Sequence, residues 1–128
     1  MIIKNTPQKT LAKAVELNGI GLHSGKAIDL VLKPSDADCG FVFVRTDLDP
    51  QVEIPALAQY VSKTDRGTTL SLEGVEVQTS EHLLAALVGC GVNNCRIELN
   101  GAEVPILDGS SKPFVEAIQN AGIQVQEA

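Results

Sequence analysis

Short stretches in which apolar and polar residues alternate mark strands in the first half of the chain. The alternation covers residues 14–17, 27–33 and 40–45, and a period of two is typical of a strand with one buried face. A Pro-Ser-Asp break at 34–36 separates the second stretch from the third. Residues 47–57 contain two prolines, so we expect any strand there to be short and to lie at a sheet edge.

The second half of the chain contains two stretches with the same order of elements. Residues 69–91 and 96–122 each predict a strand, a two-residue turn, a second short strand and a helix that ends at glycine. The turns fall at Glu73-Gly74 and Asn100-Gly101. Asn-Gly is the stronger hairpin signal, because a type I′ turn needs positive φ at both central residues.

The first predicted helix begins after Thr79 or Ser80 as its N-cap and stops at Gly89 or Gly91. Its apolar residues share one face, which we expect to be buried. These residues are Leu83, Leu84, Leu87 and Val88.

The second predicted helix begins after Ser110 or Ser111 and ends before Gly122. Pro113 stands in its first turn, where a missing N–H is harmless. The apolar stripe of this helix consists of Phe114, Val115, Ile118 and Ala121.

Two amphipathic helices and about six strands of mainly antiparallel pattern predict an α+β fold. We expect a two-layer sandwich, with a mainly antiparallel sheet and the two helices packed side by side on one of its faces. A chain of 128 residues buries about two-thirds of its unfolded surface. Residues 1–128 are therefore expected to form a single domain.

Composition and charge narrow the class of protein. Hydrophobic residues make up 44% of the chain but aromatic residues only 3%, so the core must consist of Val, Ile, Leu and Ala. The net charge is -6 and no basic run is present, which argues against a nucleic-acid partner. The sequence has no signal-peptide pattern and no apolar run of about 18 residues that could cross a membrane. We expect a cytoplasmic protein.

The three cysteines, Cys39, Cys90 and Cys95, are odd in number and form no CxxC pattern. Neither a zinc ribbon nor a disulfide framework is indicated. We expect reduced and mostly buried thiols that act as small hydrophobic side chains.

Glu81 and His82 stand at the start of the first predicted helix. The partial positive charge of a helix N-terminus stabilises Glu81 and disfavours a protonated His82, and a neutral imidazole is the form that binds a metal. Neighbouring helical residues project about 100° apart, so these two could stand side by side as a general base and a metal ligand. A glutamate in a first turn and a single histidine also have an ordinary structural explanation.

The ligand count leaves a zinc site incomplete. A four-coordinate catalytic zinc needs three protein ligands, but the only other histidine is His23 and no HExxH pattern is present. His23 lies in the glycine-punctuated stretch 18–26, which matches no phosphate-binding motif. A tight turn with a hydrogen-bonded histidine is the structural alternative.

Two further stretches carry candidate site residues. Asp108 and Gly109 precede the second helix, where a carboxylate and backbone N–H groups converge, although an Asx-type turn that leads into the N-cap is the favoured structural alternative. Thr68 and Thr69 follow Asp65, Arg66 and Gly67. They either start a strand or belong to a mobile loop near the beginning of the first helix, and for this stretch a loop role and a site role remain equally open.

Six motifs occur in the order and spacing of a known family. They are GIGLHSG, FVRTDL, GTTL, TSEHLLAAL, GVNN and EVPILDGSSKPF. With them the chain resembles, over essentially all 128 residues, the N-terminal domain of the UDP-3-O-acyl-N-acetylglucosamine deacetylases. These are the zinc amidases of lipid A biosynthesis, and hence of outer-membrane biogenesis, in Gram-negative bacteria.

The resemblance implies roles for the Glu-His pair. It assigns Glu81 as the general base and His82 as one zinc ligand, and it implies that Zn²⁺ activates water and polarises the N-acetyl carbonyl while Glu81 takes the proton. It brings Thr68, Thr69, His23 and Asp108 into consideration as substrate-binding or site-proximal residues. The expected substrate of the full-length enzyme is UDP-3-O-acyl-N-acetylglucosamine, whose N-acetyl group is hydrolysed.

The chain departs from the family at the remaining zinc ligands. The family supplies them from an HxxxD helix in a second, C-terminal domain, and this sequence contains no such motif. We therefore expect the first half of a deacetylase, an excised or truncated piece that binds zinc weakly and is inactive alone. Its expected partner is its own C-terminal domain, whose absence would leave an apolar patch and permit self-association.

Two other hypotheses remain open. One is a non-catalytic interaction or regulatory module that has kept the fold of the domain. The other is a metallohydrolase completed by homodimerisation, in which His82 and His23 of two chains share a metal.

Overall fold

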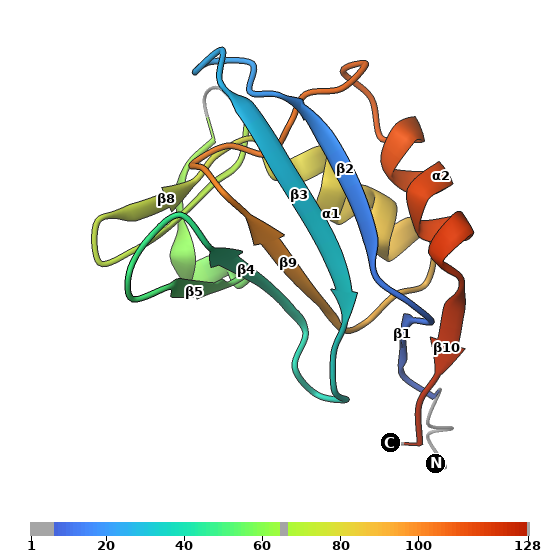
Figure 1. Ribbon diagram of the computed structural model, residues 1–128. Coiled ribbons are helices and arrows are strands. Elements are labelled where there is room, and N and C mark those ends of the chain that lie inside the picture. The colour runs from blue at the N-terminus through green and yellow to red at the C-terminus, as the bar shows by residue number, and fades with distance from the viewer. Residues whose placement is uncertain (1–6, 65–66, 128) are drawn as a thin grey trace.

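The structure, a computed structural model, describes residues 7–64 and 67–127 as an α+β fold (Figure 1). Its helices are α1 (Glu81–Gly89) and α2 (Lys112–Ala121), with a short 3-10 helix at Ala58–Tyr60. Its strands are β1 (Lys9–Leu11), β2 (Val15–Ile20), β3 (Ala27–Pro34), β4 (Phe41–Arg45), β5 (Val52–Pro55), β6 (Val61–Lys63), β7 (Thr69–Leu72), β8 (Val75–Val77), β9 (Cys95–Leu99) and β10 (Ile123–Val125).

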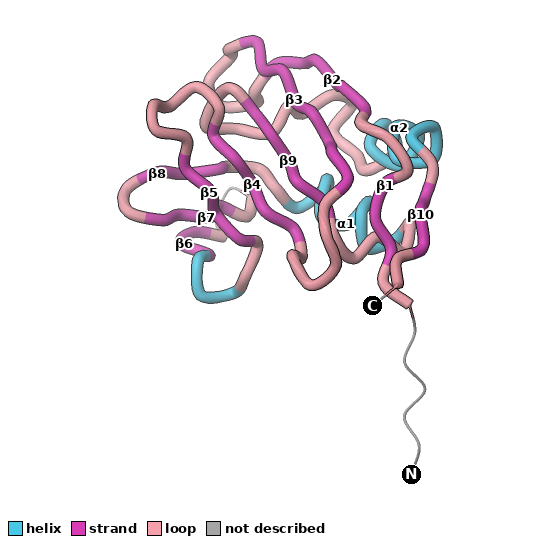
Figure 2. The backbone as a smooth tube through the Cα atoms, turned by 60° about the horizontal axis from the view of Figure 1, so that its bottom comes forward, coloured by secondary structure: helices cyan, strands magenta, loops and turns pink. Residues whose placement is uncertain are grey.

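The largest sheet has the strand order β2-β3-β9-β4-β5. Its neighbours are antiparallel except β4 and β9, which run parallel with Phe43 opposite Ile97. Strands β6, β7 and β8 form a smaller antiparallel sheet, and β1 pairs with β10 near the two ends of the chain (Figure 2). The mainly antiparallel prediction is confirmed.

Both helices lie on the same side of the large sheet, with α1 behind β2 and β3 in the view of Figure 1 and in contact with α2. This arrangement is the predicted two-layer sandwich. The core between the layers consists mainly of aliphatic side chains, with two phenylalanines, and its members are at most 3% exposed. Its largest members are Leu11, Leu30, Leu32, Phe43, Ile54, Leu70, Leu83, Leu87, Ile97, Leu99, Phe114 and Ile118.

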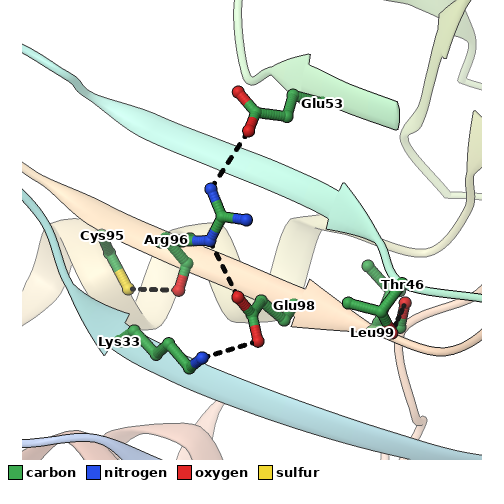
Figure 3. A network of polar contacts seen from close by, with 7 residues as sticks. All are labelled: Lys33, Thr46, Glu53, Cys95, Arg96, Glu98 and Leu99. Carbon is green, nitrogen blue, oxygen red and sulfur yellow. Dashed lines mark hydrogen bonds and ion pairs between the residues drawn. The ribbon is translucent and has the colours of Figure 1, made fainter. Parts of the chain in front are cut away.

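The opposite face of the large sheet is charged. Lys33 Nζ lies 2.9 Å from Glu98 Oε1, Arg96 Nε donates to Glu98 Oε2 at 2.8 Å, and Arg96 Nη1 reaches Glu53 Oε2 at 3.1 Å (Figure 3). Pairs that are as exposed as these contribute at most about 1 kcal/mol each. Leu32 and Ile97, which alternate with these charged residues along the strands, and Phe43 opposite Ile97 belong to the core on the side of the helices.

The alternating pattern located the strands of the first half correctly. It predicted β2, β3 and β4 to within a few residues, and the proline-containing strand β5 lies at the sheet edge as expected. The described residues form ten strands in place of about six. Strands β1, β6 and β10 have three residues each, which is too few to show an alternation.

The two predicted hairpins have different outcomes. Glu73 and Gly74 join β7 to β8 with φ of 51° and 80°, as a type I′ turn requires. The hairpin at Asn100-Gly101 is wrong, because β9 already has β3 and β4 on its two edges and no place is left for a returning strand. Asn100 Oδ1 instead accepts a hydrogen bond from the N–H of Asp29 on β3 at 2.8 Å.

Helix α1 starts and stops close to the predicted positions. Ser80 is its N-cap residue, although its hydroxyl makes no capping bond. At the other end Gly91, with φ of 80°, donates to Val88 O, and Val92 donates to Leu87 O, which is a Schellman stop. Of the predicted apolar face, Leu83 and Leu87 are buried and Leu84 is half-buried, whereas Val88 is 65% exposed and Ala86 is buried in its place.

Helix α2 agrees with its prediction. Ser111 is the N-cap residue, Pro113 lies in the first turn, and Gly122 follows the last residue. Phe114, Ile118 and Ala121 of the apolar stripe are buried and Val115 is half-buried. No helix in the described part of the chain is long and apolar enough to span a membrane.

The three cysteines are free thiols. Cys95 is buried and Cys90 is half-buried, but Cys39 is exposed, so the expectation of mostly buried thiols is wrong for Cys39. Its loop, which joins β3 to β4, lies outside the sandwich. Burial raises the pKa of Cys95 to about 12.

Candidate functional site

The Glu-His pair forms the first two residues of α1, as the sequence predicted. Both side chains are half-buried. Glu81 does not turn back onto its own helix, because its Oε2 accepts a 2.8 Å hydrogen bond from the backbone N–H of Thr68. The carboxylate is therefore oriented by the segment that precedes β7.

Thr68 also holds the residue that precedes the pair. Its carbonyl oxygen accepts hydrogen bonds from Ser80 N at 3.2 Å and Ser80 Oγ at 3.0 Å. The Ser80 hydroxyl therefore hydrogen-bonds to the loop and does not cap the amides of α1. Thr68 therefore contacts the start of α1 through both its N–H and its carbonyl oxygen. The structure places this predicted loop residue beside Glu81, the predicted base.

Gly67 is needed for this close approach. It has φ of 93°, and a Cβ at this position would lie 2.8 Å from Glu81 Oε1, which is closer than side chains tolerate. Only glycine adopts this backbone at low cost and leaves room for the carboxylate. The neighbouring Asp65 and Arg66 of the sequence prediction lie outside the described residues.

Thr69 occupies the first position of β7 and is buried. Its carbonyl oxygen lies 3.5 Å from Ser62 Oγ of the neighbouring β6. The strand explanation thus accounts for its position, and the contacts with Glu81 belong to Thr68.

A buried carboxylate that sequence reasoning missed contacts Thr79, just before the pair. Glu103 is 1% exposed, and its oxygens accept hydrogen bonds from His23 N at 2.9 Å, Ser24 N at 3.0 Å and Thr79 Oγ1 at 3.2 Å. Burial alone would raise the pKa of Glu103, but these donors hold it below its usual range. A glutamate between Ala and Val in the sequence gives no sign of this environment.

His23 lies in the turn between β2 and β3, and its side chain is exposed. Its backbone N–H donates the hydrogen bond to Glu103. The structural alternative of a tight turn with a hydrogen-bonded histidine therefore applies to the main chain of His23 and not to its imidazole ring. Glu103 also bonds Thr79, two residues before Glu81. The structure therefore links the His23 loop to the start of α1 through one carboxylate.

Asp108 forms the Asx-type turn that was its structural alternative. Its Oδ1 accepts from Ser110 N at 2.9 Å and Ser110 Oγ at 2.7 Å, and the hydrogen bonds from Ser110 hold the pKa of Asp108 below its usual range. Ser111, which follows, donates from Oγ to His82 O at 3.1 Å. Asp108 thus belongs to the connection that brings the starts of α1 and α2 together.

The described residues do not form a complete zinc site. No three His, Cys, Asp or Glu side chains in residues 7–64 and 67–127 are placed to hold a metal ion together. A catalytic zinc takes three protein ligands and keeps one position open. The half-exposed imidazole of His82 fits one of those three positions, and the described part of the chain does not supply the others.

The chain is similar to known deacetylases over almost its whole length. Residues 8–128 match the family model described as LpxC, UDP-3-O-acyl N-acetylglycosamine deacetylase. A protein named UDP-3-O-acyl-N-acetylglucosamine deacetylase from Myxococcus xanthus is 55% identical over 121 residues, which are 94% of this chain and 38% of that protein. The proteins of that name from Hahella chejuensis and Marinobacter nauticus are 55% and 54% identical, over 94% of this chain and 40% of each.

The chain thus spans about two fifths of the length of the curated relatives that it matches. The family match, in contrast, covers nearly all of this chain. The chain belongs to the UDP-3-O-acyl N-acetylglycosamine deacetylase family.

Proposed function

We propose that this chain forms the part of a UDP-3-O-acyl-N-acetylglucosamine deacetylase that supplies its general base and one zinc ligand. The observation that carries the proposal is the Glu81–His82 pair at the start of α1, with the Glu81 carboxylate fixed by the Thr68 N–H at 2.8 Å. The names of relatives that are 52–55% identical support the substrate and the reaction. The pair alone would not identify either.

Glu81 is the proposed general base. Its Oε2 is occupied by the Thr68 N–H, while Oε1 makes no hydrogen bond within the described residues and is the atom we assign to receive the proton. A carboxylate held at one oxygen keeps the other in a fixed direction, which is the positioning that proton transfer needs. Deacetylation would then release acetate and the free amine.

His82 is the proposed zinc ligand. Zn²⁺, when bound, acts as a Lewis acid on the carbonyl that is attacked and on the water that attacks it. His82 would provide one nitrogen, and residues outside the described part of the protein would provide the remaining ligands. His82 and Glu81 are neighbours on the first helical turn and project about 100° apart, so a ligand and a base can act on one reacting centre.

The outer surface of α1 supports a covering partner. Between His82 and the helix end every residue is apolar or glycine, and among these Ala85 and Val88 are exposed. A helix that is apolar on its outer side usually faces another protein surface. We assign the protein's own C-terminal domain to this face, with self-association as the consequence when that domain is missing.

The charge of the chain agrees with a divided site, that is, an active site whose residues come partly from this chain and partly from the rest of the protein. A net charge of -6 does not attract a nucleotide diphosphate. The cations that meet the diphosphate would therefore come from the rest of the protein. A nucleotide-sugar substrate also favours the cytoplasm as the location.

Zinc titration of the 128-residue chain tests the divided site. We expect weak binding that disappears in His82→Ala and persists in His23→Ala, because a single imidazole provides only a fraction of the coordination free energy. Calorimetry and metal analysis measure both affinity and stoichiometry. Tight binding lost in His82→Ala alone would mean that the chain completes the site itself, and tight binding lost in both variants with dimer formation would indicate a metal shared by two chains.

The activity itself is tested on the protein at the length that its gene encodes. Release of acetate from UDP-3-O-acyl-N-acetylglucosamine should depend on added zinc and should be abolished by a chelator. The 128-residue chain alone should release none. A zinc-loaded protein that leaves this substrate intact would contradict the proposed function and favour an interaction module with the same fold.

A further inference from the structure

We propose that Glu103 is a positioning residue, whose buried carboxylate fixes both the His23 loop and the backbone bend that leads into Glu81 and His82. This inference rests on the proposed function, because it assigns Glu103 to the same site. Glu103 does not touch the reacting atoms in this scheme. It acts through the residues that it holds.

Glu103 holds the loop that contains His23. The consecutive N–H groups of His23 and Ser24 point at the Glu103 carboxylate, and such paired amides form an anion-binding concavity. Gly21 makes this packing possible, since a Cβ there would overlap Glu103 Oε1 and Ser24 Oγ. The concavity is therefore filled by a carboxylate of the protein itself, which ties residues 21–24 to the segment after β9.

Glu103 also holds the backbone bend at Thr79 that leads into α1. Thr79 is 5% exposed and has φ of 60°, a conformation that is an outlier for a β-branched residue and persists only where the surroundings impose it. Its hydroxyl donates to Glu103 Oε2 at 3.2 Å. One residue later the chain is held by the bonds of Ser80 to Thr68, and then α1 begins.

The residue before the bend is fixed to the same segment. Gln78 N donates to Ala102 O at 2.7 Å and Val104 N donates to Gln78 O at 3.0 Å, so the main chain on both sides of Glu103 pairs with Gln78. The left-handed conformation of Thr79 is thus set between two anchored neighbours. Removing the carboxylate releases the side-chain anchor and leaves the main-chain anchors in place.

Glu103→Gln is the first test, because glutamine keeps the size of the side chain and replaces one acceptor oxygen by an NH₂ donor. That donor would face N–H and O–H donors. The chain has two histidines, so His23→Gln and His82→Gln assign the ring signals in an NMR spectrum of the 128-residue chain. We expect Glu103→Gln to shift the ring signals of both histidines and the amide signal of Thr68.

Glu98→Gln is the matched control. It also removes a half-buried carboxylate with several partners, but on the charged face of the sheet (Figure 3), and it should leave those signals in place. A folded Glu103→Gln protein with unchanged His82 and Thr68 signals would overturn the proposal. If Glu103→Gln does not fold, Thr79→Val and Thr79→Ser decide. The valine variant, which lacks the hydroxyl, should move the His82 signals and the serine variant should not, and unmoved signals in the valine variant would overturn the proposal.

Kinetics of the protein at its encoded length separate positioning from stability. We expect Glu103→Gln to lower kcat by about 10- to 100-fold with little change in KM, the range associated with a misplacement of about 1 Å. An unchanged kcat would overturn the proposal even in the presence of shifted signals. A wild-type protein without deacetylase activity would contradict the proposed function, and the NMR comparison would still decide whether Glu103 positions His82.

Discussion

Glu81 Oε2 accepts a 2.8 Å hydrogen bond from the N–H of Thr68, thirteen residues earlier in the chain. The proposed base and the loop that orients it therefore come from different elements, and the carbonyl of the same Thr68 accepts hydrogen bonds from Ser80. A helix dipole would explain a glutamate at this position but not its direction. The loop sets that direction, so loop and base should respond together to substitution.

Glu81→Gln should remove the proposed general base and keep the fold. The amide oxygen of glutamine still accepts the Thr68 N–H, so we expect the thermal transition to change little while kcat of the protein at its encoded length falls by about 10²- to 10⁴-fold. Glu116→Gln on the exposed side of α2 is the control and should keep full activity. A Glu81→Gln enzyme with wild-type kcat would assign the base elsewhere.

Gly67→Ala should affect both stability and rate. Its φ of 93° makes alanine unfavourable, and the new Cβ would lie 2.8 Å from Glu81 Oε1. Gly74 has φ of 80° in the β7–β8 turn with nothing near its Cβ position, so Gly74→Ala reproduces only the backbone cost. We expect both variants to lose about 1–2 kcal/mol of unfolding free energy in urea titrations, and kcat to fall only for Gly67→Ala. Equal kcat values in the two variants would mean that the loop does not orient the base.

The sequence predicted those parts of the fold that depend on local patterns. Alternation placed β2, β3 and β4, and glycine and serine signals placed the ends of both helices, because these features act over a few residues. The failure at Asn100-Gly101 has a tertiary cause. Turn chemistry favoured a hairpin, but both edges of β9 were already paired with strands from distant parts of the chain.

The candidate site was predictable in its residues but not in its connections. Glu81, His82 and Thr68 could be named from motifs, yet the bond between Glu81 and Thr68 depends on how the end of β8 and the start of β7 meet at α1. Glu103 was missed because its partners are main-chain N–H groups of the His23 loop. No pattern of side chains in the sequence records such partners.

The three thiols should react with a disulfide reagent in the order of their exposure. Cys39 is exposed, Cys90 is half-buried, and burial raises the pKa of Cys95 to about 12, so Cys95 has almost no thiolate at neutral pH, and the thiolate is the reactive form. We expect Cys39 to react first and Cys95 to react only on unfolding. Cys39→Ser should remove the fast phase of labelling in a colorimetric assay, and a fast phase that survives would contradict the assigned exposure.

Glu103 should make the protein acid-sensitive. Because its pKa is lower in the folded chain than the ordinary 4.5, the unfolded state binds more protons as the pH falls. The stabilisation is therefore present above the ordinary value and is lost as the pH drops through the lower, folded pKa. The difference in unfolding free energy between wild type and Glu103→Gln should be largest near neutral pH and should shrink in urea titrations as the pH falls below 4.5.

Salt distinguishes Glu103 from the other glutamate with a lowered pKa, Glu98. Burial raises the pKa of Glu98, but its hydrogen bonds and ion pairs with Arg96 and Lys33 lower the pKa by more than burial raises it. Charge pairs at the surface weaken when the screening length falls to a few ångströms at about 1 M salt. The partners of Glu103 are uncharged N–H and O–H groups in a buried position. High salt should therefore flatten the pH-dependent difference for Glu98→Gln and leave that for Glu103→Gln intact. Equal flattening in both variants would mean that charged neighbours, and not the His23 loop and Thr79, set the pKa of Glu103.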